Sequence, residues 1–224
     1  MIRRYKINPL DKYLILTTND TKIDNYPNIK KHLTLFKKKL ENRHDYQTGN
    51  FDWWRIVNLR NIEWLTSKQD KLFVPMAAPE NRFVYIHSDD FYCEGDMYVL
   101  MIIDKEFDLR YVQGVLNSNL MNLLIKRIAK KLDGGAKTEN SKSSGRVAYS
   151  TNNIKNIPIK IVSKKQQNEI RSLVEKIEKL YHEKEKSLNK DEIQKEIELV
   201  DLEINSLVNK IYNITDDDLK ILKS

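Results

Sequence analysis

The chain contains a single cysteine, Cys93, among its 224 residues. One cysteine cannot form an internal disulfide, and it is too few for a cysteine-based zinc cluster. The sequence also has no apolar run near the roughly 18 residues needed to cross a bilayer, and its N-terminus lacks the apolar core of a signal peptide. We therefore expect a cytoplasmic protein without a membrane segment.

Several enzyme motifs are absent as well. No glycine-rich loop follows an expected strand, and Asn8-Pro9-Leu10-Asp11 shares only its first two residues with the Asn/Asp-Pro-Pro-aromatic segment of DNA methyltransferases. Asp11 with Asp20-Thr21-Lys22 is a poor match to the carboxylates and lysine of a PD-(D/E)xK nuclease. The four histidines are His32, His44, His87 and His182, and their spacing suits neither a metal site nor a catalytic triad. We expect neither catalysis nor a metal site in this chain alone.

Positive charge is concentrated in the first three quarters of the chain. The whole sequence has a formal net charge of +7. Residues 1–163 hold 27 Lys and Arg against 18 Asp and Glu, a balance of +9, whereas residues 164–224 hold 12 against 14, a balance of −2. A basic body indicates binding to a polyanion such as nucleic acid, although a lysine-rich surface can also be merely solvated.

The pattern of apolar residues predicts a mixed α+β globule followed by an antiparallel helical hairpin. We place the globule at residues 1–162 and the hairpin at 163–224. Two short strands are expected before residue 17, one of them at residues 13–16, and a basic amphipathic helix follows over residues 27–43. The later elements expected in the globule are strands at 72–74, 83–86 and 97–103 and helices at 108–116 and 119–132.

The C-terminal segment carries the most regular pattern in the sequence. Ser163-Lys164-Lys165-Gln166 is a capping box that begins one helix. A second helix start near Asn189 precedes an apolar stripe at alternating spacings of four and three, formed by Ile193, Ile197, Val200, Ile204, Leu207 and Ile211. Such a coiled-coil-like stripe must be buried. Beyond the hairpin itself it can rest on the globule, on a second copy of the chain or on a second protein domain, and we expect the second domain or a homodimer.

Two segments carry candidate binding residues. Trp54 and Arg55 lie in an aromatic cluster, and Arg60 follows closely. Arginine can bond the major-groove edge of guanine with two hydrogen bonds, and aromatic rings can stack on bases or support such an arginine. We nevertheless expect at least one tryptophan to fill a core, because burying a large ring stabilises the fold more than exposing it.

The second segment is the polar loop from residue 133 to 147. Its glycines, hydroxyl groups and amines suit phosphate and base contacts, although it lacks the GxxxxGK[ST] order of a nucleotide-binding loop. The alternative is a solvated connector. Its candidate residues are Lys137, Thr138, Ser141, Lys142 and Arg146.

The order of segments along the chain resembles one protein family. The segments are Tyr26-Pro27-Asn28-Ile29-Lys30-Lys31-His32-Leu33, Phe51-Asp52-Trp53-Trp54-Arg55, Val115-Leu116-Asn117-Ser118, Ala148-Tyr149-Ser150 and Ile157-Pro158-Ile159, followed by the helical tail. In this order they resemble the target-recognition domain of type IIG restriction–modification enzymes and adenine-N6 DNA methyltransferases, known as the TaqI-like C-terminal specificity domain.

The resemblance implies a non-catalytic domain that recognises a sequence in double-stranded DNA. It implies a methyltransferase partner, in the same polypeptide or as a separate subunit, that uses S-adenosylmethionine, with magnesium where a nuclease domain is also present. The candidate DNA-binding residues would then be those of the two segments above. Two alternatives stay open, a coiled-coil assembly protein with an incidental basic body and an RNA-binding module.

Overall fold

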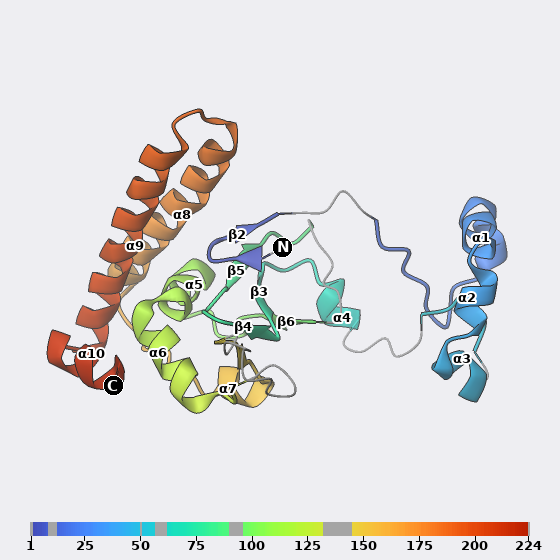
Figure 1. Cartoon of the computed structure of the whole chain (residues 1–224), viewed down its shortest axis with the longest axis horizontal. Helices are drawn as coiled ribbons and strands as arrows, with labels where there is room; N and C mark the ends of the chain where they lie inside the picture. The colour runs from blue at the N-terminus through green and yellow to red at the C-terminus, as the bar shows by residue number, and fades with distance from the viewer. Residues whose placement is uncertain are drawn as a thin grey trace, which may run out of the picture. The chain divides into compact units, whose positions relative to one another are not determined.

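The computed structural model describes residues 2–8, 13–49, 51–56, 62–89, 96–131 and 145–223. The chain forms two compact units, a larger unit of Met1–Pro9 with Ser67–Ser224 and a smaller unit of Leu10–Thr66. The fold is mixed α+β with a C-terminal helical hairpin, as predicted (Figure 1). The ranges 1–162 and 163–224 do not coincide with these compact units, and as functional domains they stay a prediction.

A three-stranded antiparallel sheet in the order β5-β3-β6 forms the centre of the larger unit. Its strands are β3 (Lys71–Pro75), β5 (Val84–Ile86) and β6 (Met97–Leu100), close to the strands predicted from the sequence. β3 pairs on both sides, so Leu72 and Val74 are fully buried. Two short ladders complete the unit, one between β1 (Ile2–Arg3) and β2 (Lys6–Ile7) and one between β4 (Ala77–Ala78) and β7 (Val147–Ala148).

Helices α5 (Leu109–Asn117), α6 (Asn119–Ile128) and α7 (Thr151–Lys155) belong to the same unit. The carboxylate of Asp108 begins α5 because it accepts hydrogen bonds from the backbone N–H groups of Arg110 and Tyr111. Ser118 ends α5 and caps α6. α6 ends before the predicted residue 132 because Ala129 is extended and Lys131 forms a β-bridge.

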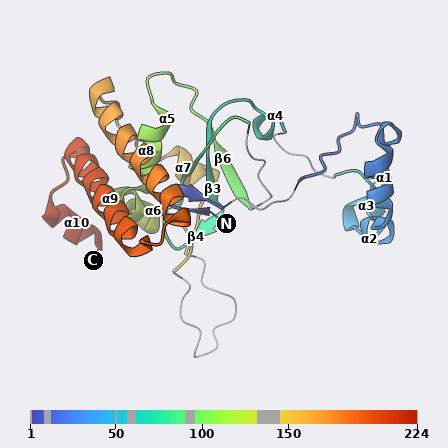
Figure 2. The same ribbon diagram turned by 90° about the horizontal axis from the view of Figure 1, so that it is seen from above.

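The C-terminal segment forms α8 (Lys164–Lys186), α9 (Lys190–Tyr212) and α10 (Asp216–Lys223). The capping box at Ser163 and Gln166 is confirmed by both of its hydrogen bonds. α8 and α9 form a hairpin, and Figure 2 shows it from above, beside α6. Although α8 and α9 have 23 residues each, no helix among the described residues is long and apolar enough to cross a bilayer.

The apolar stripe of α9 is buried within the larger unit itself. Ile197, Val200 and Ile204 are buried, and they share one core with buried residues of α5, α6, α8 and β3. Gly114 of α5 allows this packing, because an added Cβ there would lie 2.5 Å from Cγ2 of Ile170. We expected this stripe to pack on a second domain or a second copy of the chain, but it packs on other elements of its own unit. Sequence periodicity shows that a face is buried, but not what covers it.

The part of the smaller unit that the structure describes has short helices and few buried side chains. Its elements are η1 (Ile23–Asn25), α1 (Pro27–Thr34), α2 (Lys37–Glu41), α3 (His44–Thr48) and α4 (Ile62–Leu65). Among its described side chains only Thr17 and Ile23 are buried. The single helix predicted over residues 27–43 is interrupted at Leu35 and Phe36. The predicted strand at residues 13–16 is irregular chain, since Tyr13 is almost fully exposed and has no core to pack on.

Candidate functional site

The structure describes three of the eight predicted site residues. Trp54 and Arg55 lie in the smaller unit, and Arg146 lies in the larger unit. The others lie outside the described residues, and they are Arg60, Lys137, Thr138, Ser141 and Lys142. The candidate site is therefore built from two separate segments, each described within its own unit.

A cluster of hydrogen bonds fixes the backbone around Arg55. The guanidinium of Arg43 donates to the carbonyl oxygens of Trp53 at 2.9 Å and Arg55 at 3.0 Å, and its Nε donates to that of Leu40 at 2.9 Å. The hydroxyl of Thr17 donates to the carbonyl of Trp54 and accepts from the N–H of Ile56. These bonds hold residues 53–56 in one conformation although no strand or helix includes them.

The side chain of Arg55 lies against an aromatic ring. Its guanidinium carbon is 4.7 Å from the ring centroid of Phe51, and the residue is half-buried. Its Nε is buried and has no hydrogen-bond partner among the described residues. The ring contact uses the face of the guanidinium, so its terminal N–H groups, and not the buried Nε, are the ones suited to bind an acceptor on another molecule.

The tryptophans of this segment are only partly buried. Trp53 and Trp54 are both intermediate in exposure, and Nζ of Lys37 lies 5.5 Å from the ring centroid of Trp53. Neither Trp53 nor Trp54 therefore fills a core, contrary to our expectation for at least one tryptophan. Part of each ring is available for contact with another molecule.

Arg146 lies at the C-terminal end of the predicted polar loop, in the larger unit. It directly precedes β7 and is exposed, and its guanidinium donates to the carbonyl oxygen of Ala77 at 3.5 Å. Gly145 before it has a positive φ of 61°, a conformation that glycine adopts without strain. The base of the loop is thereby fixed to the β4–β7 ladder.

The segments that carry the family resemblance in the larger unit are structural. The side-chain amide of Asn117 bonds both the N–H and the carbonyl of Phe83, and the hydroxyl of Tyr149 donates to Asn81. Asn117 and Tyr149 are buried, and burial raises the pKa of the Tyr149 hydroxyl. These residues join α5, the sheet and β7 within the larger unit.

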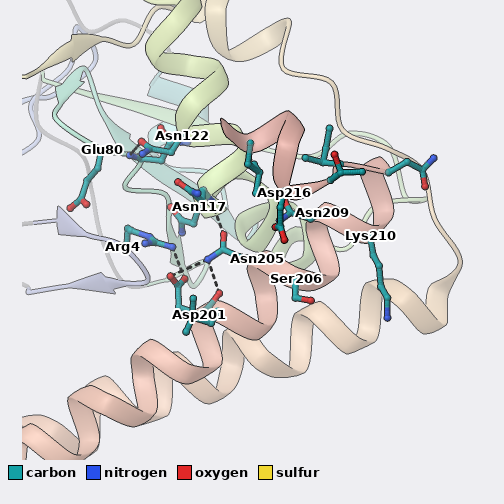
Figure 3. Close-up of a pocket in the computed structure, with 17 residues that line it drawn as sticks. Arg4, Glu80, Asn117, Asn122, Asp201, Asn205, Ser206, Asn209, Lys210 and Asp216 are labelled. Carbon is teal, nitrogen blue, oxygen red and sulfur yellow. Dashed lines mark hydrogen bonds and ion pairs between the residues drawn. The ribbon is translucent and has the colours of Figure 1, made fainter. Parts of the chain in front are cut away.

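A polar cavity of about 940 Å³ lies on the larger unit beside α6, α9 and α10 (Figure 3). Asn205 and Asn209 of α9 and Asn213, the residue that caps its C-terminus, line this cavity at intervals of four residues, a spacing that was not noticed in the sequence. Arg4 pairs with Asp201 at its edge, and Asn205 donates to the same carboxylate. Burial raises the pKa of Asp201 in spite of the neighbouring Arg4.

The contribution of the Arg4–Asp201 ion pair to stability can be measured with two variants. Arg4→Met should lower the free energy of unfolding by about 1–3 kcal/mol, because it leaves a largely buried carboxylate without its cation. Asp201→Asn should cost less, since the amide oxygen still accepts from Arg4. Without Arg4, the pKa of Asp201 in the folded state should rise further above its unfolded value. The loss of unfolding free energy in Arg4→Met should therefore grow as the pH rises through the acidic range. Urea unfolding at pH 4 and pH 7 measures both effects, and a deficit that shrinks with rising pH would contradict them.

The charged cluster around His87 does not have the arrangement of a catalytic triad. Nδ1 of His87 lies 3.7 Å from a carboxylate oxygen of Asp70 and also contacts the hydroxyl of Ser88. Both contacts involve the same ring nitrogen, so the imidazole cannot relay a proton between them. Among the residues that the structure describes, no group of three His, Cys, Asp or Glu side chains is arranged to hold a metal ion.

Two comparisons relate the chain to known proteins. The family model described as the TaqI-like C-terminal specificity domain matches residues 1–159. The chain is also similar to the type II methyltransferase M.MjaIV of Methanocaldococcus jannaschii, with 28% identity over 183 residues. That alignment covers 78% of this chain and 56% of the relative, so the chain spans about half the length of the curated relative it matches.

Proposed function

This chain belongs to the TaqI-like C-terminal specificity domain family, and on that premise we propose that it recognises a sequence in double-stranded DNA for a restriction–modification enzyme. The observation that carries the proposal is the family match over residues 1–159, which includes the smaller unit and the loop that ends at Arg146. The basic balance of residues 1–163 supports a polyanionic partner.

The finer proposal concerns the enzyme that this domain would serve. We propose an adenine-N6 DNA methyltransferase, of the type IIG class where a nuclease domain is also present. Its catalytic part would bind S-adenosylmethionine, which supplies the methyl group, and magnesium would serve the nuclease. This chain would hold the duplex while the catalytic part acts on the target adenine, which must leave the base stack.

Arg55 is the side chain best placed for base recognition. Arg43 and Thr17 fix its backbone, and Phe51 supports its guanidinium. A preorganised arginine loses little conformational freedom on binding the two acceptors of a guanine edge. Trp54 and Arg60 would add contacts from the same segment, and the loop residues Lys137, Thr138, Ser141, Lys142 and Arg146 would contact phosphates and bases.

Replacing Arg55 or Arg146 with alanine should reduce discrimination between DNA sequences and leave the fold intact. The loss of one bidentate arginine–guanine contact corresponds to about 1–3 kcal/mol, or roughly a 5- to 150-fold smaller preference for the correct base. Competition binding between duplexes that differ at single base pairs measures this preference. Lys38→Ala, an exposed cation in the same unit as Arg55, serves as the control and should weaken binding equally for all sequences. Unchanged base preference in both arginine variants would contradict the site.

Binding should also fall steeply with salt. Lysines and arginines that neutralise phosphates release counterions, so the affinity of the full chain should fall by orders of magnitude between about 50 and 200 mM salt. Fluorescence anisotropy with a labelled duplex measures the slope. Salt-independent binding would show that the basic balance of the body plays no part.

The structure offers little support for an assembly role. That alternative depended on the apolar stripe of α9, which is buried in the core of the larger unit. Leu199 and Leu202 remain exposed on α9, next to Glu198 and Glu203. A homodimer through the C-terminal helices would have to use this outer face.

A further inference from the structure

An exposed apolar pair interrupts the basic helical segment of the smaller unit. Leu35 and Phe36 lie between α1 and α2, and they are 77% and 48% exposed. The pair is not a frayed chain end, because the N–H of Phe36 donates to the carbonyl of Leu33 and its own carbonyl accepts from the N–H of Leu40. One edge of the Phe36 ring contacts His32, with 5.4 Å between the ring centroids. Leu35 therefore projects from a defined backbone without a hydrophobic neighbour to cover it.

Lysines surround this apolar pair. Residues 27–43 contain five lysines and Arg43 against a single acidic residue, Glu41, which gives a net charge of +5. Lys31 precedes Leu35 by one helical turn, and Lys38 and Lys39 follow it by one turn. These three lysines are exposed and have no ion-pair partner in the described part of the chain. They are free to bind anions on either side of Leu35.

The charge decides which partner fits the surface. A second copy of the chain would bring two segments of +5 together, so self-association through this pair would be opposed by repulsion. A DNA duplex presents phosphates on both sides of a groove and apolar base faces between them. Proteins that bend DNA use this combination, with cations on the phosphates and an apolar side chain inserted between two base pairs.

We propose that Leu35 acts as a wedge that enters between base pairs of double-stranded DNA, with Phe36 against the adjoining sugar and Lys31, Lys38 and Lys39 on the flanking phosphates. The inference rests on the proposed DNA-recognition function and adds a distortion of the duplex to it. Partial unstacking at the wedge makes binding depend on how easily the contacted step opens, so the wedge contributes to sequence preference without hydrogen bonds to bases.

The test compares the full-length chain with Leu35→Ser, using relaxed closed-circular plasmid treated with topoisomerase I. An inserted wedge unwinds the duplex, so the wild-type chain should change the linking number of the plasmid after the protein is removed. Leu35→Ser should leave the linking number unchanged and bind duplex about tenfold more weakly, since the lysines still contact phosphates. Anisotropy with a labelled mixed-sequence duplex measures that affinity, and circular dichroism checks that the fold is retained.

Leu199→Ser is the matched control, because Leu199 is 66% exposed on α9 beside acidic residues and should behave as wild type in both assays. The triple substitution of Lys31, Lys38 and Lys39 by glutamine should lower the salt slope by up to about three. Changing Lys179 and Lys195, exposed lysines of α8 and α9, to glutamine should alter the slope less.

The outcomes separate the wedge from the proposed function. Duplex binding by the wild-type chain without a change in linking number would overturn the wedge and leave DNA recognition in place. Equal unwinding by the wild-type chain and Leu35→Ser would also overturn the wedge and leave DNA recognition in place. A wild-type chain that does not bind duplex DNA at low salt would overturn both the wedge and the proposed function.

Discussion

Replacing Ile204 with aspartate is expected to destabilise the whole larger unit, so that it unfolds in one cooperative transition at a much lower temperature. Ile204 has no exposed surface and lies in the core where α5, α8 and α9 meet, with its Cγ2 atom 3.8 Å from the position of a Cβ on Gly114. A buried unpaired carboxylate there should cost more than about 4 kcal/mol, a large part of the 5–15 kcal/mol that stabilises a typical domain. Thermal unfolding followed by circular dichroism measures the loss.

The matched control for Ile204→Asp lies on the same helix. Leu202 is 64% exposed, so Leu202→Asp should shift the melting temperature by only a few degrees. If Ile204→Asp instead melted like the wild-type chain, the hairpin would not be part of the core.

Arg43→Met is expected to disrupt the smaller unit and to abolish sequence-specific binding. The substitution removes the side-chain donor of the Trp53 and Arg55 carbonyls, and it leaves the Leu40 carbonyl with only the backbone N–H of residue 43. Each hydrogen bond to a charged group contributes about 1.5–3 kcal/mol, and a unit with so few buried side chains has little stability to lose. Limited proteolysis should then cleave within residues 10–66 while the larger unit resists, and duplex binding should lose its base preference.

Two further variants make the Arg43 result specific. Arg43→Lys should restore only part of the protection, because one ammonium nitrogen can donate to the carbonyls of Trp53 and Arg55, as Nη2 does, but it lacks the Nε–H that reaches Leu40. Lys22→Met removes an exposed cation of the same unit and should leave proteolysis unchanged. Protection of residues 10–66 in Arg43→Met equal to that of the wild-type chain would show that Arg43 does not hold the segment.

Local signals in the sequence predicted the elements of the larger unit well. The capping box at Ser163 and the cap at Asp108 each satisfy donors within a few residues of themselves, so the sequence contains all the information needed. The strands between residues 71 and 103 were also predicted, because β-branched and aromatic residues alternate with turns there. The partner of the α9 stripe was not predictable, since it depends on α5 and on the space that Gly114 leaves.

The candidate site was only partly accessible from sequence. Trp54 and Arg55 could be nominated because an arginine among aromatic rings is unusual for a solvated loop. The role of Arg43 was missed, because its acceptors at Trp53 and Arg55 lie 10 and 12 residues away in the chain. The break at Leu35 and Phe36 was missed as well, since Phe36 continues the apolar spacing of an amphipathic helix although the structure leaves it 48% exposed.

The most direct test of sequence recognition is selection from a randomised duplex library. The full chain, incubated with the library at moderate salt and sequenced after several rounds, should enrich one short motif. Arg55→Ala, selected in parallel, should enrich a motif that is degenerate at one or more positions. Failure of the wild-type chain to enrich any motif, or its preference for single-stranded RNA over the duplex in direct competition, would contradict the assignment of this chain as a domain that recognises DNA sequence.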